Sequence, residues 1–244
     1  MSQILRTVAC VGVVLGLLFL TGCGSDDPEP TTTPTTSTTT EDEDLDKNGY
    51  SVNAHVQPEL GVVPDDIELD GREGTPPPEP SEADLESAAE AAGCDLQLDL
   101  RDEGNTHLDD EDVPDVEYDT NPPTSGDHYG NPRETLSGAL ADGAYLEPPP
   151  VGRLVHSLEH GRVEIQYSPD LPEDDQLALK GVFDDDSEGV IFFPNPEMPY
   201  EVAVTAWTQL LGCETFEGDA TLDAIQAFRD VFRGQGPEPI PLSL

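Results

Sequence analysis

The sequence predicts a single α+β domain with a small sheet and C-terminal helices, preceded by a disordered tether. Stretches with polar and apolar residues in alternation, such as 162–167, are typical of half-buried strands, and longer amphipathic runs indicate helices. Residues 23–80 lack hydrophobic periodicity and combine a Thr/Pro-rich run with acidic clusters, which is typical of a disordered linker. The remaining residues, 81–244, are sufficient for one domain with its own core.

Residues 1–22 have the features of a lipoprotein signal peptide. Arg6 precedes an apolar run from Val8 to Leu20, which is short for a membrane span. The run ends in Leu20-Thr-Gly-Cys23, similar to the bacterial lipobox, in which the cysteine is acylated. An uncleaved anchor helix is the alternative interpretation. We therefore expect the mature chain at the extracytoplasmic face of the cell membrane, with the membrane as its partner through a lipid on Cys23.

The charge of the chain excludes one class of partner. Its formal net charge is −42, from 10 Lys and Arg against 52 Asp and Glu. Such a chain is repelled by nucleic acid and by anionic lipid headgroups. The acidic runs lack the ligand spacing and the glycine of an EF-hand loop, which favours solvated surface over calcium sites. The sequence does not identify a protein partner.

The first half of the domain is predicted to hold two helices and a long loop region. Ser81-Glu-Ala-Asp84 resembles a capping box and opens an alanine-rich helix that should end near Gly93. The following residues, to about Pro150, are rich in Asp, Gly and Pro, which indicates loops with short strands. A short helical turn over Leu154–His160 should stop at Gly161.

The second half is predicted to be more regular. A strand over 162–167, a helix over 172–183 and a buried strand over 190–193 would form a βαβ unit. Two further helices are expected over 200–211 and 221–232.

Two of the four cysteines are expected to form a disulfide. Cys10 would leave with the signal peptide and Cys23 would carry lipid, so Cys94 and Cys213 remain in an oxidising compartment. A bridge that closes so long a loop would stabilise the fold by roughly 4–5 kcal/mol in the chain-entropy model. The rival interpretation, a two-cysteine metal or redox site, lacks Cys-x-x-Cys spacing.

The five histidines give the strongest functional signal. His128 ends the motif Asn-Pro-Pro-Thr-Ser-Gly-Asp-His, and His156 and His160 belong to His-Ser-Leu-Glu-His. Residues four apart on a helix share a face, so the last two can hold one ion. We predict a metal site from these three, with His107 and with Met198 as a thioether ligand. Imidazole with thioether favours Cu(I), so copper is expected, with zinc as second choice.

Other interpretations of the same residues stay open. A structural cluster would have Thr124, Ser125 and Glu159 hydrogen-bonded to the imidazoles. In a metal site the same three residues would orient the ligands through hydrogen bonds. His156-x-x-Glu159-His160 also matches an inverted zinc-peptidase motif, with Glu159 activating water, although its helix should end too early. A serine hydrolase lacks the Gly-x-Ser-x-Gly motif. Met198 could instead pack at the start of the next helix.

The wider motif pattern resembles a bacterial family. It includes Gly-Asn-Thr-His107, the motif that ends at His128, the segment Leu154–Gly161, Pro196-Glu-Met-Pro199 and Thr205-Ala-Trp207. These motifs are similar to those of the domain of unknown function 3105 family over about residues 90–239. The resemblance implies a domain boundary and no activity. From the residues themselves we expect a metal carrier or chaperone without turnover; the alternative is a non-catalytic cell-envelope interaction lipoprotein.

Overall fold

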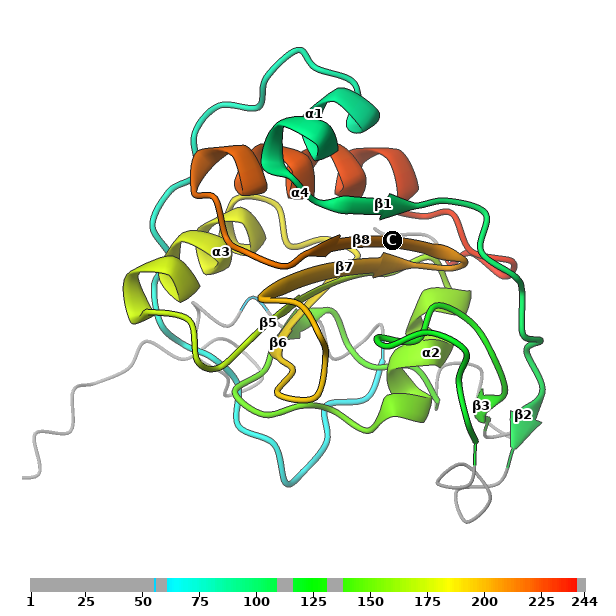
Figure 1. The fold of residues 1–244 in the computed structure, drawn as a ribbon. Helices are drawn as coiled ribbons and strands as arrows, with labels where there is room; N and C mark the ends of the chain where they lie inside the picture. Colours follow the sequence, from blue (N-terminus) through cyan, green and yellow to red (C-terminus); the bar gives the residue numbers. More distant parts are fainter. Residues whose placement is uncertain (1–54, 56–60, 109–115, 131–137, 241–244) are drawn as a thin grey trace, which may run out of the picture. The chain divides into compact units, whose positions relative to one another are not determined.

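The computed structural model describes residue 55 and residues 61–108, 116–130 and 138–240 (Figure 1). The predicted signal peptide, Cys23 and most of the predicted tether lie outside these residues. The described residues confirm an α+β fold with helices packed on a mixed sheet. Within them, no helix is both long enough and apolar enough to cross a membrane.

The fold has four described helices and eight described strands. The helices are α1 (Leu85–Ala92), α2 (Val151–Glu159), α3 (Glu173–Asp185) and α4 (Asp219–Phe232). The strands are β1 (Asp95–Gln97), β2 (His107–Leu108), β3 (His128–Tyr129), β4 (Gly143–Ala144), β5 (Val163–Tyr167), β6 (Val190–Pro194), β7 (Val202–Ala206) and β8 (Gln209–Cys213).

Six strands form the main sheet in the order β1-β8-β7-β5-β6-β4, and β2 and β3 form a separate parallel pair. β5 and β6 are parallel neighbours joined through α3, which confirms the predicted βαβ unit. β7 and β8 extend the sheet as an antiparallel hairpin. Figure 1 shows α1, α3 and α4 on one side of the sheet and α2 on the other.

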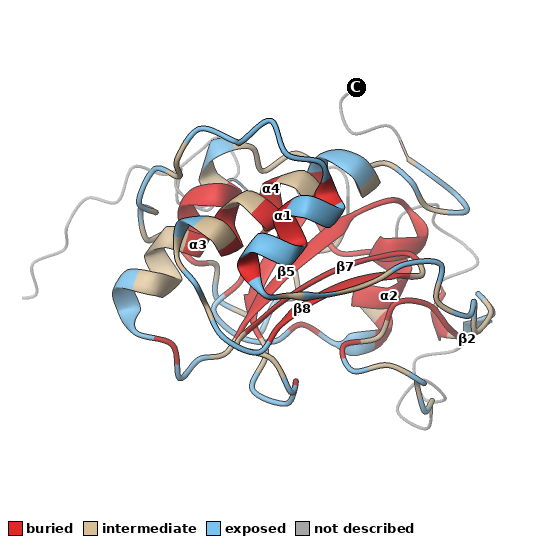
Figure 2. Ribbon diagram, turned by 45° about the horizontal axis from the view of Figure 1, so that its top comes forward, coloured by how far each residue is buried: buried red, intermediate tan, exposed pale blue. Residues whose placement is uncertain are grey.

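Successive side chains of β5 lie on opposite faces of the sheet. Val163, Ile165 and Tyr167 belong to the large apolar cluster formed with α1, α3 and α4. Glu164 and Gln166 point to the opposite face, where α2 lies, and both are buried. The central strands are buried along their whole length, whereas the outer faces of the helices are exposed (Figure 2). The second face therefore combines burial with polar side chains, unlike the first.

The predicted helix over 200–211 is wrong, because these residues form the β7–β8 hairpin. Val202, Val204 and Thr205 are β-branched, and such side chains favour the pleated surface of a strand. The turn consists of Trp207 and Thr208, and Thr208 has a φ of 60°. No glycine or asparagine marks that turn, so the sequence lacks the usual hairpin signal.

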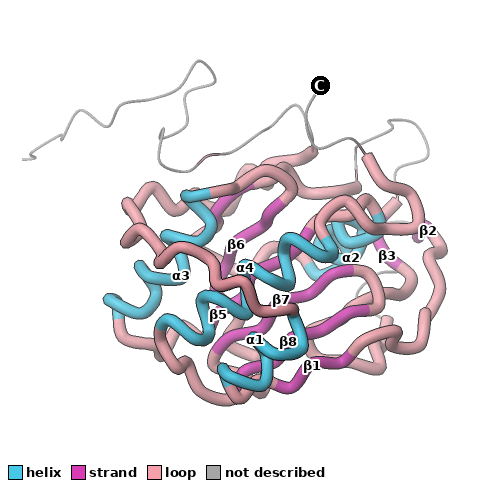
Figure 3. Tube along the Cα trace, turned by 90° about the horizontal axis from the view of Figure 1, so that it is seen from above, coloured by secondary structure: helices cyan, strands magenta, loops and turns pink. Residues whose placement is uncertain are grey.

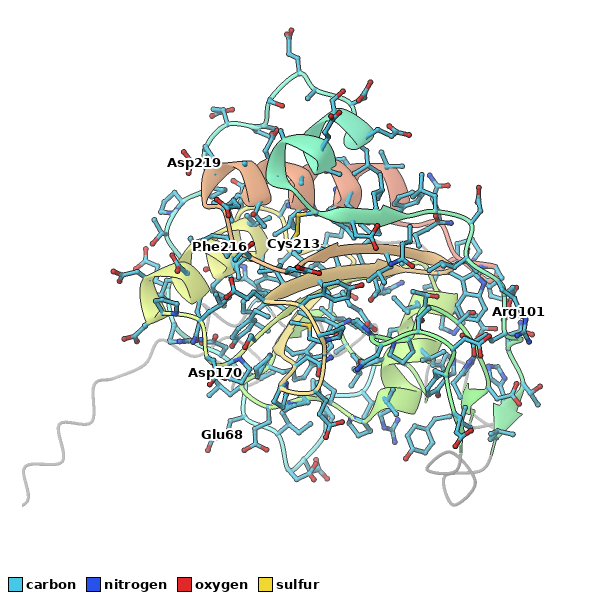
Figure 4. All side chains as sticks on the ribbon, in the orientation of Figure 1. Glu68, Arg101, Asp170, Cys213, Phe216 and Asp219 are labelled. Atoms are coloured by element: carbon cyan, nitrogen blue, oxygen red, sulfur yellow. A yellow bond between two sulfur atoms is a disulfide. The ribbon has the colours of Figure 1, made fainter. Side chains whose placement is uncertain are left out.

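The disulfide between Cys94 and Cys213 is confirmed, with 119 residues of separation (Figure 4). Cys94 follows the left-handed Gly93 that ends α1, as predicted. Cys213 ends strand β8 rather than a helix. The bond therefore links the end of α1 to the strand beside β1. The start of α1 also differs slightly, since Asp84 rather than Ser81 caps it by accepting the Ser87 amide.

The described part of the predicted tether, residues 61–80, packs on the domain instead of extending from it. Val62 and Leu69 form isolated bridges with Leu140 and Tyr145. Asp70 is fully buried and holds the guanidinium of Arg72 through both carboxylate oxygens. The Pro and Asp content of this stretch concealed three apolar residues that cover the second face of the sheet: Val63, Ile67 and Leu69.

Candidate metal centre

The β2–β3 pair brings two of the predicted ligands together. His107 and His128 are direct partners in its parallel register. Their ring centroids lie 4.9 Å apart. Gly130 follows β3 where a methyl group would overlap the side chain of His107, so a residue without a Cβ is required at that position.

Helix α2 supplies the other members of the cluster. It lies beside β3 in both Figure 1 and Figure 3. His156 and Glu159 are one helical turn apart, and His160 follows as the C-terminal cap. The chain then turns at Gly161, whose φ of 82° suits glycine, and continues into β5 as predicted. The helix is shorter than the predicted peptidase motif would need, because it ends inside that motif.

The structure places three of the expected ligands in one cluster and adds Glu159, which was expected only to support them. One ligand atom from each of His107, His128, His156 and Glu159 lies within 4.8 Å of the others. Nε2 of His107 is 3.1 Å and Nε2 of His128 is 3.2 Å from the same Oε2 of Glu159. Two ligands of one tetrahedral zinc ion, with bonds of about 2.0–2.1 Å, lie roughly 3.3 Å apart. The two separations are those of hydrogen bonds, and they are also close to the spacing of two atoms that share an ion.

Backbone carbonyls fix the orientation of the buried imidazoles. Nδ1 of His128 lies 2.8 Å from the carbonyl of Gly126, and Nδ1 of His156 lies 2.5 Å from that of Tyr129. A carbonyl oxygen only accepts, so each Nδ1 carries the proton. Nε2 of each ring is then the nitrogen that points into the cluster. In His128 this nitrogen donates to the Glu159 carboxylate, and a metal ion would take the place of that proton.

Glu159 gives the cluster its negative charge. Its Oε1 accepts a hydrogen bond of 2.9 Å from the amide of Asn105, and Oε2 faces the two histidines of the strand pair. Burial by itself would raise the pKa of Glu159, but the hydrogen bond and charge of His128, with the donors Asn105 and His107, lower it to about 2. The side chain is therefore a carboxylate at neutral pH.

His156 stays neutral in this environment. Burial is the main cause that lowers its pKa to about 3, and the neighbouring charges of His128 and His160 act in the same direction. Its Nε2 lies 2.8 Å from Nε2 of His160. A lone pair on His156 thus faces the other ring, and only a proton or a cation makes such a contact favourable.

His160 belongs to a second, overlapping group. Its Nδ1 is bound by the carbonyl of Glu238 at 2.8 Å, and the amide of Glu238 donates to the carbonyl of Glu159. Ligand atoms of Glu159, His160 and Glu238 also lie within 4.8 Å of one another. The C-terminal segment therefore positions the end of α2 and adds an exposed carboxylate beside the cluster.

The cluster is open to solvent on one side. His128, His156 and Glu159 are buried, whereas 44% of the His107 side chain is exposed. Low dielectric surroundings strengthen the attraction between a cation and Glu159. An ion would therefore enter or leave past His107.

Met198 does not fit the prediction that it is a ligand. It packs in an apolar cluster with Ala203 and Leu210, with Leu100 and Tyr200 beside it. The hairpin that replaces the predicted helix provides this apolar surface. Met198 therefore fills core space, as unbranched methionine often does.

Thr124 and Ser125 also differ from their predicted role beside the imidazoles. Ser125 Oγ accepts from the amide of Glu103 and lies 3.5 Å from the carbonyl of Arg101. Thr124 Oγ1 is buried without a partner among the described residues. Ser125 thus connects the loops before β2 and β3, whereas the carbonyl of Thr124 accepts from the amide of Thr208 in the β7–β8 turn. Neither side chain is hydrogen-bonded to a ring of the cluster. Asn105 has the supporting role, and its position two residues before His107 was the only signal for it.

A family comparison extends these observations. A family described as "Protein of unknown function (DUF3105)" matches residues 110–240, more than half of the chain. The chain belongs to this family. The matched residues contain His128, His156, Glu159 and His160, whereas His107 precedes them. No curated protein and no solved structure matches the chain.

Proposed function

We propose that this DUF3105 protein binds one divalent metal ion through His107, His128, His156 and Glu159, with zinc favoured. The observation that carries the proposal is the convergence of three imidazoles and a carboxylate within 4.8 Å. Backbone carbonyls accept from Nδ1 of two buried rings, which leaves Nε2 of each ring pointing into the cluster. Three histidines with one carboxylate are a ligand set that suits zinc.

Because Met198 packs in an apolar cluster, the metal that we expect differs from the one expected from the sequence. Copper was expected because a thioether beside imidazoles favours Cu(I). With Met198 in an apolar cluster, the set consists of nitrogen and oxygen donors, which suit Zn(II) and also Cu(II). Zinc is therefore our first choice and Cu(II) our second.

The role that we propose is storage or transfer of the ion without turnover. In the inverted peptidase motif, Glu159 would need a free oxygen to activate water. Here Oε1 is bound to Asn105 and Oε2 faces two histidines. The exposed side of His107 supports transfer, because a ligand at the surface can exchange first.

We also propose that the metal is bound outside the cytoplasm, on a lipid anchor at Cys23. The lipobox-like sequence and the Cys94–Cys213 disulfide support this location, because disulfides persist in oxidising compartments. Labelling with a radioactive fatty acid checks the anchor: label should enter the wild-type chain and should not enter the Cys23→Ala variant.

The decisive experiment measures metal content and affinity by mass spectrometry and titration calorimetry with Zn(II), Cu(II) and Cu(I). We expect one tightly bound Zn(II) in the wild type. His128→Ala should weaken binding by more than the roughly 10- to 100-fold that loss of an outer-shell partner costs. His55→Ala is the matched control, because His55 lies near Asp184, outside the cluster.

The result could also contradict the proposal. Equal zinc affinity in the His128→Ala and His55→Ala variants, or no binding by the wild type, would exclude it. The cluster would then be a hydrogen-bonded structural element of a non-catalytic interaction protein.

A further inference from the structure

A cavity lies on the polar face of the sheet and is not part of the metal centre. Its volume is about 470 Å³, which is within the range of small-molecule sites. α2 lines it with Val151, Leu154 and Val155, and β5 lines it with Glu164 and Gln166.

Polar side chains beside the cavity form a series of hydrogen bonds, each of which is donated toward Glu164. The Asn195 amide donates to Oε1 of Gln166 at 2.8 Å, and the Gln166 amide donates to Oε2 of Glu164 at 3.2 Å. The hydroxyl of Thr205 donates to the same Oε2 at 3.0 Å. Oε2 of Glu164 therefore accepts two hydrogen bonds, and the series of hydrogen bonds ends there.

The other oxygen of Glu164 has no partner among the described residues. Glu164 is only 2% exposed, and its Oε1 makes no hydrogen bond. Leaving a buried polar atom unpaired costs about 1–3 kcal/mol. The hydroxyl of Thr120, another residue that lines the cavity, is also buried without a partner. Both unpaired atoms therefore belong to residues that line the cavity.

The charge of the lining excludes one kind of ligand. No Lys, Arg or His is among the residues that line the cavity, so an anion would have no counter-charge. Most of the remaining lining is apolar. It is formed by one aliphatic face of α2 and by aromatic and proline rings, namely Tyr118, Pro123, Pro148, Pro149, Phe193 and Pro196.

The protonation state of Glu164 determines whether the cavity favours a neutral or a cationic ligand. Burial raises the pKa of Glu164 to about 8, although the Thr205 hydroxyl opposes this. The carboxyl group is therefore protonated at neutral pH. Because Oε2 accepts two hydrogen bonds, the proton lies on Oε1, the oxygen that has no partner among the described residues.

We propose that this cavity binds an uncharged organic molecule that has a carbonyl or amide oxygen next to a flat apolar ring. The oxygen accepts the hydrogen bond from Glu164, and the ring packs between the proline and aromatic walls. Thr120 provides a second polar contact. This site is independent of the metal, since none of the proposed metal ligands lines it.

The test uses three probes of nearly equal shape: benzamide, benzoate and benzamidine, which are neutral, anionic and cationic. Saturation-transfer NMR on the full chain at slightly acidic pH gives their affinities. Benzamide should bind better than either charged probe. Glu164→Leu should weaken it by roughly tenfold, which corresponds to the loss of one hydrogen bond. Glu164→Gln should keep it within about twofold, because an amide also accepts and donates.

The same series shows which result would overturn the proposal. Glu197→Gln makes the same chemical change at an exposed position in the lining and should have no effect. Wild-type binding should weaken as Glu164 ionises, whereas Glu164→Gln should not respond to pH. Tyr118 and Glu197 are the other titratable residues of the lining. Failure of benzamide to bind the wild type, equal binding by Glu164→Leu, or a preference for benzamidine would each exclude a neutral-ligand site.

Discussion

His107 and His128 are direct partners in the β2–β3 register, yet 44% of one side chain is exposed and the other is fully buried. The two imidazoles approach the same oxygen of Glu159 from different environments. They should therefore have different effects on metal binding. The buried ring should determine affinity, and the exposed ring should determine the rate of exchange.

The first prediction compares alanine variants of these two residues. His107→Ala should lower zinc affinity by roughly tenfold and speed its loss to an added chelator, because the exposed ligand leaves first. His128→Ala should lower affinity by a much larger factor. Stopped-flow transfer of zinc to a coloured chelator measures both. Identical dissociation rates for wild type and His107→Ala would contradict an exit path past this residue.

The second prediction concerns Gly138, where a methyl group would overlap Nδ1 of His156. Gly138→Ala should displace this ring, break its hydrogen bond to Tyr129 and weaken zinc binding by at least tenfold. Gly93→Ala is the control, because a methyl group there meets nothing within 4 Å and only the left-handed φ of 68° is strained. It should cost about 1 kcal/mol of stability and leave zinc affinity unchanged. Equal effects of the two variants on calorimetric zinc affinity would argue against a role for His156.

The third prediction separates Met198 from the metal. Met198→Leu should leave the affinities for Zn(II), Cu(II) and Cu(I) unchanged and change stability by less than about 1.5 kcal/mol, since the swap conserves volume. Met198→Ala should destabilise the fold by about 2 kcal/mol or more through the loss of apolar contacts. Metal titration and urea unfolding provide the two readouts. A selective loss of Cu(I) affinity in the leucine variant would restore the thioether as a ligand.

The fourth prediction is a pH effect on stability from Glu164. Its pKa rises from 4.5 to about 8 on folding, so the folded state binds a proton that the unfolded state releases. This contribution is fully present below about pH 4.5 and is lost as the pH rises to about 8. Glu164→Gln cannot ionise, so it should gain stability relative to wild type over that range, by on the order of a few kcal/mol.

Urea unfolding at several pH values tests this difference. The contributions of other titrating groups to the free energy of unfolding cancel, because the two proteins differ at one residue. Glu197→Gln, at an exposed position, should show no such trend. A stability difference between Glu164→Gln and wild type that is constant with pH would show that Glu164 is already charged in the folded protein.

The sequence predicted part of the candidate metal site. The i, i+4 spacing of His156 and His160 correctly indicated that their rings meet, but it did not show that Glu159 joins the first group while His160 belongs to the second. The disulfide was simpler to predict, because the expected roles of Cys10 and Cys23 leave one pairing. The pairing of His107 with His128 depends on a strand contact across a loop, which no local pattern shows. The β7–β8 hairpin was missed because Thr208, rather than glycine, occupies the left-handed turn position.

The polar face of the sheet shows a second limit of local patterns. The alternation along β5 correctly predicted a strand, but it implied that Glu164 and Gln166 face solvent. They are buried because α2, the loops and residues 61–80 cover this face. A period-two pattern gives the side of the sheet on which a residue lies; what covers that side depends on tertiary contacts. The cavity could therefore be found only in the structure.

The Cys94–Cys213 bond has a consequence for the unfolded chain. All four proposed zinc ligands lie between its two cysteines, on a closed ring of the polypeptide. When the protein unfolds without reduction, these side chains remain on that ring at a high effective concentration, so zinc retains some affinity for the denatured ensemble. A ligand that binds both the native and the denatured state stabilises the native state by less than its affinity for that state alone implies. Zinc should therefore raise the melting temperature of the reduced chain more than that of the oxidised chain.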